Sequence, residues 1–260
     1  MTITILAKKE VAYKQSQEQE MLLQLKLKTT KMAAIQPPLY PPNLERWRSH
    51  VQVRIPQCKI VNDDGKMGQP WGIAFGKDGV WAVVDCSNHC VCIFDSQDKL
   101  NKKFESSGKG NGQLSYPCGL AFDANNYLYV VDIGNHRVQK FDINGGYLLQ
   151  FGSTGSGDGQ LSNPVGITVY NDRVFVADRS NNRISVFQCD GQFSNTFGSG
   201  HLSSPYDVAV TNNNQVLVAG YGHHCISIFT LDGNYVNKIG TLGSDRGQLV
   251  LLLIYMALYL

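Results

Sequence analysis

Four prolines divide most of the chain at regular intervals. Pro70, Pro117, Pro164 and Pro205 are separated by 47, 47 and 41 residues, and a period in this range is typical of solenoids and propellers. Each proline opens the same pattern, in which a short apolar run, a polar turn and three further runs follow one another. A chain that repeats one four-part unit in this way is expected to fold as a series of similar units, not around one irregular core.

The apolar runs predict β-strands. The first run of each unit reads PWGIAF, PCGLAF, PVGITV and PYDVAV, and the third ends in Phe94, Phe141, Phe187 and Phe229. The runs are short, rich in β-branched and aromatic residues, and bounded by Gly, Asn, Asp or Pro. No sustained helical periodicity follows residue 57. Four strands in each unit of about 45 residues predict an all-β fold, a β-propeller of four-stranded blades.

Composition changes near residue 57, where we predict a domain boundary. None of the 26 glycines precedes residue 65, whereas five of the nine prolines do. Residues 1–57 are expected to form a charged, proline-rich segment that is short-helical or irregular. A helix is predicted within 8–31, with a strand as the alternative. The segment is also interpreted as the remnant of an upstream domain. The propeller is expected over 58–249, followed by an apolar tail at 250–260. The predicted blades are 70–116, 117–163, 164–204 and 205–249.

The remaining composition excludes several classes of protein. Seven cysteines without a paired spacing argue against a disulfide framework. The first ten residues do not resemble a secretory signal, so a cytoplasmic location is expected. The apolar run at 249–260 is shorter than the ~20 residues that span a bilayer, which predicts no membrane association. A net charge of +2 produces no strong field over the whole molecule.

One block of each unit resembles a known repeat. The segments DCSNHCVCIF, DIGNHRVQKF, DRSNNRISVF and GYGHHCISIF, which begin at residues 85, 132, 178 and 220, resemble the NHL repeat. The linkers GNGQLSYP and GDGQLSNP are similar to those of NHL propellers in tripartite-motif (TRIM) proteins. The resemblance covers roughly residues 58–249. It implies a ring of six blades that acts as a recognition scaffold, in a family whose RING-containing members are ubiquitin ligases. This chain lacks the RING.

Four units where the resemblance implies six predict an incomplete ring, and therefore a fragment. After Gly247–Leu249 the repeat should reach Pro and Gly, but Leu252 and Ile254 stand there. The run Cys58–Val61 lies where an outermost strand belongs, without inner strands before it. A closed four-bladed ring is the alternative. Open edges favour self-association, and the apolar tail is either prone to aggregation or, as we favour, packs as an innermost strand against the fourth blade.

Glycines recur at one position of the innermost runs. Gly72, Gly119 and Gly166 share this position, and Asp207 replaces them in the fourth unit. A residue without Cβ allows backbones to approach closely, so we predict that these strands crowd around a central axis.

The same innermost runs bear on catalysis. A cation-dependent propeller hydrolase resembling the gluconolactonases is the alternative function, and it needs several carboxylates that converge on the axis. The innermost runs carry packing residues instead, and Asp207 is a single carboxylate. The sequence therefore predicts that the chain is not an enzyme and has no cofactor.

A cysteine-rich turn suggests zinc. Cys86, His89, Cys90 and Cys92 are all zinc-binding residue types. Their equivalents in the second unit include Arg137 and Gln139, so these are ordinary repeat positions that happen to hold cysteine. Small, half-buried hydrophobic cysteines are the simpler interpretation, and no metal site is predicted.

The Asp-x-x-Asn segments between the second and third runs predict structural turns. Asp accepts backbone N–H groups and Asn tolerates positive φ, so the pair closes a tight turn. The residues assigned to this role are Asp85, Asn88, Asp132, Asn135, Asp178 and Asn181.

The two faces of the predicted blades differ in charge. The second-to-third turns and the linkers share one face, which collects basic and aromatic residues, and the other face collects aspartates. A basic face with aromatic residues suits protein or single-stranded RNA partners. Arg137→Ala and Arg183→Ala are then expected to weaken a salt-sensitive interaction. The predicted binding residues are Lys109, His136, Arg137, Arg179, Arg183, Tyr206, Tyr221 and His224.

Overall fold

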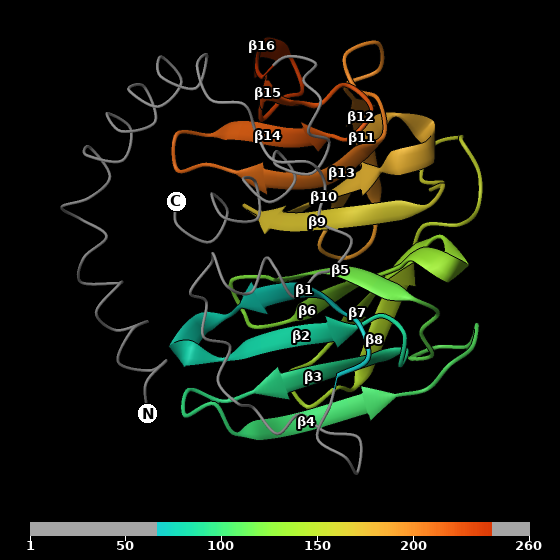
Figure 1. The fold of residues 1–260 in the computed structure, drawn as a ribbon, viewed down its shortest axis with the longest axis vertical. Coiled ribbons are helices and arrows are strands. Elements are labelled where there is room, and N and C mark those ends of the chain that lie inside the picture. Colours follow the sequence, from blue (N-terminus) through green and yellow to red (C-terminus); the bar gives the residue numbers. More distant parts are fainter. Residues whose placement is uncertain (1–66, 241–260) are drawn as a thin grey trace, which may run out of the picture. The chain divides into compact units, whose positions relative to one another are not determined.

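The structure is a computed structural model, and it describes residues 67–240. The described residues form four antiparallel sheets of four strands each, in which the strands lie side by side in chain order (Figure 1). Short 3₁₀ turns at Lys77–Gly79, Ile133–Asn135 and Arg179–Asn181 join some of the strands. The prediction of an all-β fold built from four-stranded propeller blades is therefore confirmed. The predicted helix within 8–31, the strand Cys58–Val61 and the tail 250–260 lie outside the described residues.

Each sheet begins at one of the four repeat prolines. The first sheet contains β1 (Pro70–Phe75), β2 (Trp81–Asp85), β3 (Cys90–Phe94) and β4 (Leu100–Glu105). The second contains β5 (Pro117–Phe122), β6 (Leu128–Asp132), β7 (Arg137–Phe141) and β8 (Tyr147–Phe151). The third contains β9 (Pro164–Tyr170), β10 (Arg173–Asp178), β11 (Arg183–Gln188) and β12 (Phe193–Phe197). The fourth contains β13 (Pro205–Val210), β14 (Gln215–Gly220), β15 (Cys225–Thr230) and β16 (Tyr235–Ile239).

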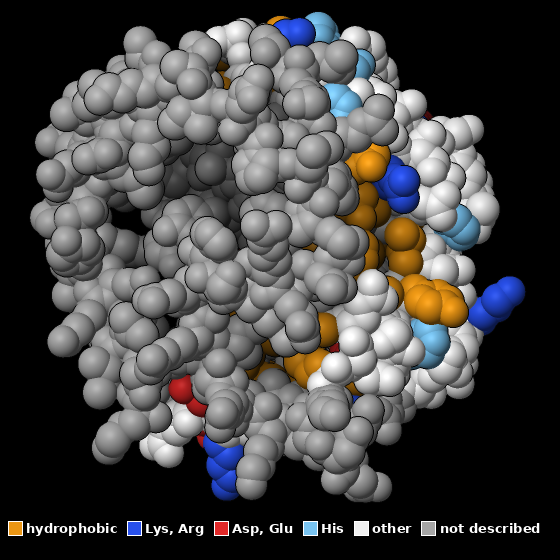
Figure 2. All heavy atoms as spheres, in the orientation of Figure 1, with side chains coloured by type: hydrophobic (Ala, Val, Ile, Leu, Met, Phe, Trp, Pro, Cys, Tyr) orange, Lys and Arg blue, Asp and Glu red, His pale blue; other side chains and the backbone are white. Residues whose placement is uncertain are grey.

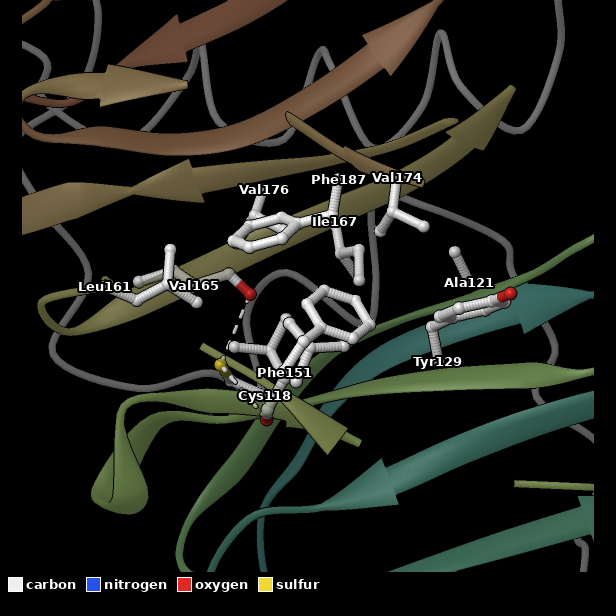
Figure 3. Close-up of a cluster of buried hydrophobic side chains, with 12 residues drawn as sticks. Cys118, Ala121, Tyr129, Phe151, Leu161, Val165, Ile167, Val174, Val176 and Phe187 are labelled. Carbon is white, nitrogen blue, oxygen red and sulfur yellow. Dashed lines mark hydrogen bonds between the residues drawn. The ribbon is translucent and has the colours of Figure 1, made fainter. Parts of the chain in front are cut away.

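The hydrophobic core lies between consecutive sheets. The middle strands are buried on both faces, as the unbroken apolar runs of their sequences require. One cluster joins the second and third sheets, where Tyr129, Val131 and Phe151 meet Ile167 and Phe187 (Figure 3). Similar clusters join the first sheet to the second and the third to the fourth. Each sheet is thus stabilised mainly by its neighbours in the chain, as expected for a repeat architecture.

The innermost strands approach one another very closely at the repeated glycine. A Cβ atom added at Gly119 would lie 2.3 Å from the carbonyl oxygen of Val165, and one added at Gly72 would lie 2.5 Å from that of Cys118. At Gly166 the obstacle is the Cα atom of Asp207, at 2.5 Å. Real Cβ atoms do not approach backbone this closely, so the prediction that these strands are crowded is confirmed.

Two further observations concern membranes and disulfides. Within residues 67–240, no helix is long and apolar enough to cross a membrane. None of the six cysteines of this part of the chain forms a disulfide.

Candidate binding site on the turn face

We call turn face the surface formed by the turns between the second and third strands and by the linkers that lead into the next sheet. It lies on the side to which β2 and β14 point in Figure 1. Three buried aspartates anchor it. Asp132 accepts the N–H of Ser115 at 2.6 Å, and Asp178 accepts that of Ser162 at 2.7 Å. Each aspartate therefore holds the linker that leads into its own sheet.

Asp85 makes the same connection in the first sheet. Its carboxylate accepts the N–H groups of Gly68 and Gln69 at 2.7 and 2.9 Å, and the Asn88 amide donates to it at 2.8 Å. Burial by itself would raise the pKa of Asp85, but these donors outweigh burial and hold the pKa below its ordinary value. The three aspartates accept backbone N–H groups of the linkers, and Asp85 also accepts that of Asn88 in its own turn.

Arg137 and Arg183 are part of this anchoring and lie beneath the surface. Arg137 Nε donates to Asp132 at 2.8 Å, and Arg183 Nε donates to Asp178 at the same distance. The remaining nitrogens of each guanidinium donate to linker carbonyls, those of Lys109, Gly110 and Gln113 for Arg137 and those of Ser156, Gly157 and Gln160 for Arg183. The two side chains are only 7% and 11% exposed. The geometry thus gives both arginines a role in holding the linkers.

In each turn the residue with positive φ is the one directly after the asparagine, and not the asparagine itself as the sequence predicted. His89, His136, Asn182 and His224 have φ between 50° and 55°, whereas Asn88, Asn135 and Asn181 do not have positive φ. The asparagines instead use their amides: Asn135 Nδ2 donates to both Asp132 and the Gly108 carbonyl, and Asn181 Nδ2 does the same with Asp178 and Gly155. The expectation that these asparagines have positive φ is therefore wrong.

We call the residue with positive φ in each of these turns the left-handed residue. In the first three sheets its side chain also connects the sheet to the next one. His89 Nδ1 accepts the N–H of Tyr116 at 2.9 Å, and His136 Nδ1 accepts that of Asn163 at 2.9 Å. Asn182 Oδ1 accepts the N–H of Ser204 at 2.7 Å. The donor in each case is the residue directly before the next repeat proline. His136, which the sequence assigned to binding, is therefore also a connector between sheets.

Aromatic side chains lie close together on the part of the turn face that is nearest to the innermost strands. The ring centroids of Trp71 and Tyr206 are 6.1 Å apart, those of Tyr206 and Tyr221 are 6.0 Å apart, and those of Tyr221 and His224 are 6.3 Å apart. The guanidinium of Arg179 lies over the Tyr206 ring at 5.7 Å. We call these five residues the aromatic cluster. The structure thus brings together four of the predicted binding residues.

Trp71 is not among the binding residues predicted from the sequence. It comes directly after the repeat proline, as Tyr206 does, so its position in the repeat could have indicated it. Trp71 is 43% exposed and Tyr221 is 39% exposed, so their rings are available to a partner. Burial raises the pKa of Tyr206, and the charge of Arg179 offsets this in part. The Tyr206 hydroxyl therefore stays protonated at neutral pH.

Charge is distributed unevenly around the cluster. Lys109 is exposed on a linker, and the right-hand side of Figure 2 shows hydrophobic side chains together with Lys, Arg and His side chains. Asp158 adds one exposed acid on another linker. Aspartates of the opposite face, such as Asp95 and Asp142, accept the backbone N–H groups of their own turns.

Asp207 occupies the crowded glycine position of the innermost strands, next to Tyr206. Its carboxylate accepts the N–H of Val208 at 2.9 Å, but burial dominates and raises the pKa of Asp207 to about 7. The folded protein therefore holds this proton more tightly than the unfolded chain, and stability falls as the pH rises from about 4 through 7.

Asp207→Asn is expected to remove this dependence. Between pH 5 and pH 8 the wild-type protein should lose about 2 kcal/mol of unfolding free energy relative to the variant, because only the wild type must ionise a buried carboxyl. Urea unfolding at both pH values measures the difference. Asp158→Asn, on an exposed linker, is the control and should follow the wild type. Parallel pH profiles for wild type and Asp207→Asn would contradict the assignment.

The cysteines near this face are packing residues. Cys90 and Cys92 are buried in β3, and a hydrogen bond with the neighbouring Cys90, together with burial, raises the pKa of Cys92. Over residues 67–240, no group of three or more His, Cys, Asp or Glu side chains is placed to hold a metal ion.

Several solved structures are similar to this chain. A streptogramin B lyase matches with a TM-score of 0.55 at 16% identity, covering 68% of this chain and 56% of that one. A catalytically inactive virginiamycin B lyase from Staphylococcus aureus with quinupristin matches with a TM-score of 0.55 at 15% identity, covering 72% and 60%. Hydrazine synthase from Kuenenia stuttgartiensis matches with a TM-score of 0.54 at 16% identity, covering 66% and 49%. The chain thus spans about half to three fifths of these structures.

These matches correct one prediction. The sequence predicted that the chain is not an enzyme, but structures of similar fold include two lyases and hydrazine synthase. Enzymes therefore occur among proteins that contain this fold, and the exclusion is wrong. At this level of identity the similarity shows the fold alone and assigns no reaction.

The chain matches none of the curated protein sequences compared with it. A family model does match it, that of the NHL repeat, over residues 67–94, 114–141, 161–187 and 202–229. Each match begins in a linker and ends in the third strand of one sheet, and so takes in the anchoring aspartate or its equivalent and the left-handed residue. The chain therefore carries four NHL repeats, one in each blade.

Proposed function

We propose that the turn face binds single-stranded RNA and that the aromatic cluster is the centre of the site. The observation that carries the proposal is the continuous series of rings from Trp71 through Tyr206 and Tyr221 to His224, with Arg179 beside it. Exposed rings offer stacking surfaces to unpaired bases, and stacking contributes about 1–3 kcal/mol per base. Rings about 6 Å apart along one surface suit successive bases of a single strand.

The charges around the cluster support a polyanionic ligand. Arg179 is part of the cluster, and Lys109 is exposed on a linker of the same face. The carboxylates of Asp85, Asp132 and Asp178 are buried and occupied by backbone N–H groups, so they oppose a phosphate less than exposed acids would. Phosphate contacts supply much of the affinity of such sites and make it salt-dependent.

A protein partner is the second candidate, and β1 favours it. Ile73 and Phe75 are 38% and 58% exposed and follow Trp71 on the same side of the strand. Exposed apolar residues beside Trp, Tyr and Arg are typical of protein interfaces. The linkers GNGQL and GDGQL support a place for such a module in a TRIM-type protein.

Replacing cluster residues is expected to weaken RNA binding. Trp71→Ala should raise the Kd for a short, fluorescently labelled single-stranded RNA about tenfold, because one stacking surface is lost. Arg179→Ala should raise the Kd and lower the slope of log Kd against log salt by about 1, because one phosphate contact is lost. Fluorescence anisotropy over a range of salt concentrations measures both.

Two variants on the opposite side of the blades serve as controls. Tyr127→Ala removes an exposed ring from the turn between β5 and β6, and Lys77→Ala removes a charge from the turn between β1 and β2. Both should bind as the wild type does. If the controls weaken binding and the cluster variants do not, the site lies on the opposite face. If the protein binds no RNA but loses a co-purifying protein in Trp71→Ala, the second candidate is correct.

A further inference from the structure

One nitrogen of the fourth blade lacks the partner that its equivalents have. In the first three blades the left-handed residue accepts the N–H of the residue before the next proline, Tyr116, Asn163 or Ser204. His224 has the same conformation, with φ at 50°, and its Nδ1 is buried, yet among residues 67–240 it has no hydrogen-bond partner. A buried acceptor without a donor destabilises a fold, so we expect a donor from outside these residues.

Sequence spacing indicates which residue supplies it. Acceptor and donor are 27 residues apart for His89 and Tyr116, and again for His136 and Asn163. The same interval from His224 reaches Leu251. The residues before Leu251 support this alignment of the repeat. The tripeptide GQL stands at 247–249, as it does at 112–114 and 159–161.

The buried leucine of that tripeptide shows what the segment does elsewhere. Leu114 and Leu161 are fully buried, and their N–H groups donate to Ser106 and Ser153 at 2.8 Å. Each belongs to the hydrophobic cluster between its own sheet and the one before. Leu249 is the equivalent residue after the fourth sheet, and the residues that follow it are apolar, as an innermost strand requires.

The face of the fourth blade that points away from the third blade is suited to receive such a segment. Phe104, Phe151 and Phe197 pack against a phenylalanine of the next sheet, with centroids 4.7, 4.7 and 5.2 Å apart. Ile239 holds the same position in β16 and is 45% exposed. On the same face, Ala209, Leu217, Ala219, Ile226 and Ile228 form a hydrophobic cluster to which, within residues 67–240, no other sheet contributes.

The geometry points to residues 247–258 of this chain as the occupant of that face. Leu249 packs against the fourth blade as Leu161 packs between the second and third. The Leu251 N–H donates to His224 Nδ1, and residues 252–258 lie beside β13 as the innermost strand of a further unit. A second copy of the chain and an unrelated protein are the competing occupants.

Substitutions at Leu251 test the predicted donor. The equivalent residues Tyr116, Asn163 and Ser204 have φ of 47–50°, which proline cannot adopt, and proline has no N–H. Leu251→Pro should therefore lower Tm by about 3–6 °C. Leu251→Asn restores the residue found at 163, tolerates positive φ, and should leave Tm unchanged or raise it. An equal loss in both variants, or no loss in either, would overturn the proposal.

Substitutions at His224 test the acceptor. His224→Ala should lower Tm, whereas His224→Asn should retain it, because Asn182 performs the same role in the third blade. In the double variant of His224→Ala and Leu251→Pro, the combined loss should fall well below the sum of the single losses. His136→Ala, whose donor Asn163 is in the structure, is the positive control. Additive losses would overturn the proposal.

Oligomeric state separates the competing occupants. The coupling between His224 and Leu251 should be independent of protein concentration, and light scattering should give a monomer under the same conditions. A coupling that disappears on dilution together with a dimer would assign the donor to a second copy. Loss of a co-purifying protein in Leu251→Asn as well as in Leu251→Pro would assign the face to that protein.

Discussion

Arg137→Ala is expected to lower the free energy of unfolding by about 3–5 kcal/mol, the usual cost of breaking a buried ion pair by removing one partner. The substitution leaves Asp132 buried and fully enclosed without its cation. It also removes the donors to the carbonyls of Lys109, Gly110 and Gln113, which hold the linker between the first two blades. Urea unfolding followed by tryptophan fluorescence measures the change.

Arg179→Ala is the matched control, because this arginine is partly exposed and contacts the Tyr206 ring. It should change stability by no more than about 0.5 kcal/mol while weakening RNA binding. Arg137→Ala should do the reverse, with near-normal affinity per folded molecule. If Arg137→Ala is as stable as the wild type but fails to bind, the arginine acts at the surface, as its sequence position first suggested.

Gly119→Ala is expected to lower the free energy of unfolding by about 3 kcal/mol, at the upper end of the cost of overpacking a core. The added Cβ would lie 2.3 Å from the Val165 carbonyl oxygen and 3.3 Å from the Cα atom of Gly166. Both obstacles are backbone atoms of the next innermost strand, so relief requires two blades to separate. The hydrophobic cluster between these blades, which includes Cys118 and Ile167, would be disturbed with them.

Gly220→Ala is the control for this substitution. Its added Cβ would meet nothing closer than 3.5 Å, an ordinary van der Waals contact, and Gly220 does not have a positive φ. This variant should be as stable as the wild type or slightly more stable, because alanine restricts the unfolded chain. Equal stability of Gly119→Ala and Gly220→Ala would show that the innermost strands are less crowded than the structure has them.

The architecture could be predicted because it is written four times. A single PWGIAF run is a weak signal, but the same run after Pro70, Pro117, Pro164 and Pro205 identifies a unit and its strand boundaries. The crowded glycines could be predicted for the same reason, since a side chain missing at one position in three successive units has a common steric cause.

The site was harder to predict, because sequence does not show where a charged side chain goes. Arg137, Arg179 and Arg183 all lie in or directly after second-to-third turns, and the sequence treated them alike. Arg137 and Arg183 begin a third strand and face the anchoring aspartate five residues earlier, whereas Arg179 directly follows that aspartate and reaches Tyr206. Trp71 and Tyr206 are 135 residues apart in the chain, and only packing brings their rings to 6.1 Å.

The sequence by itself determined the repeat, the four-stranded unit and the residues that crowd the innermost strands, because each of these depends on short-range pattern and steric fit. Only the tertiary structure decided which basic residues are available to a partner. Whether an arginine is exposed or buried depends on contacts between blades, because linker carbonyls and solvent compete for the same guanidinium N–H donors. The structure also showed that, of the four left-handed residues, only His224 lacks a hydrogen-bond partner within residues 67–240. The sequence could not show this, because an unpaired acceptor is recognised only by comparison with equivalents that are paired.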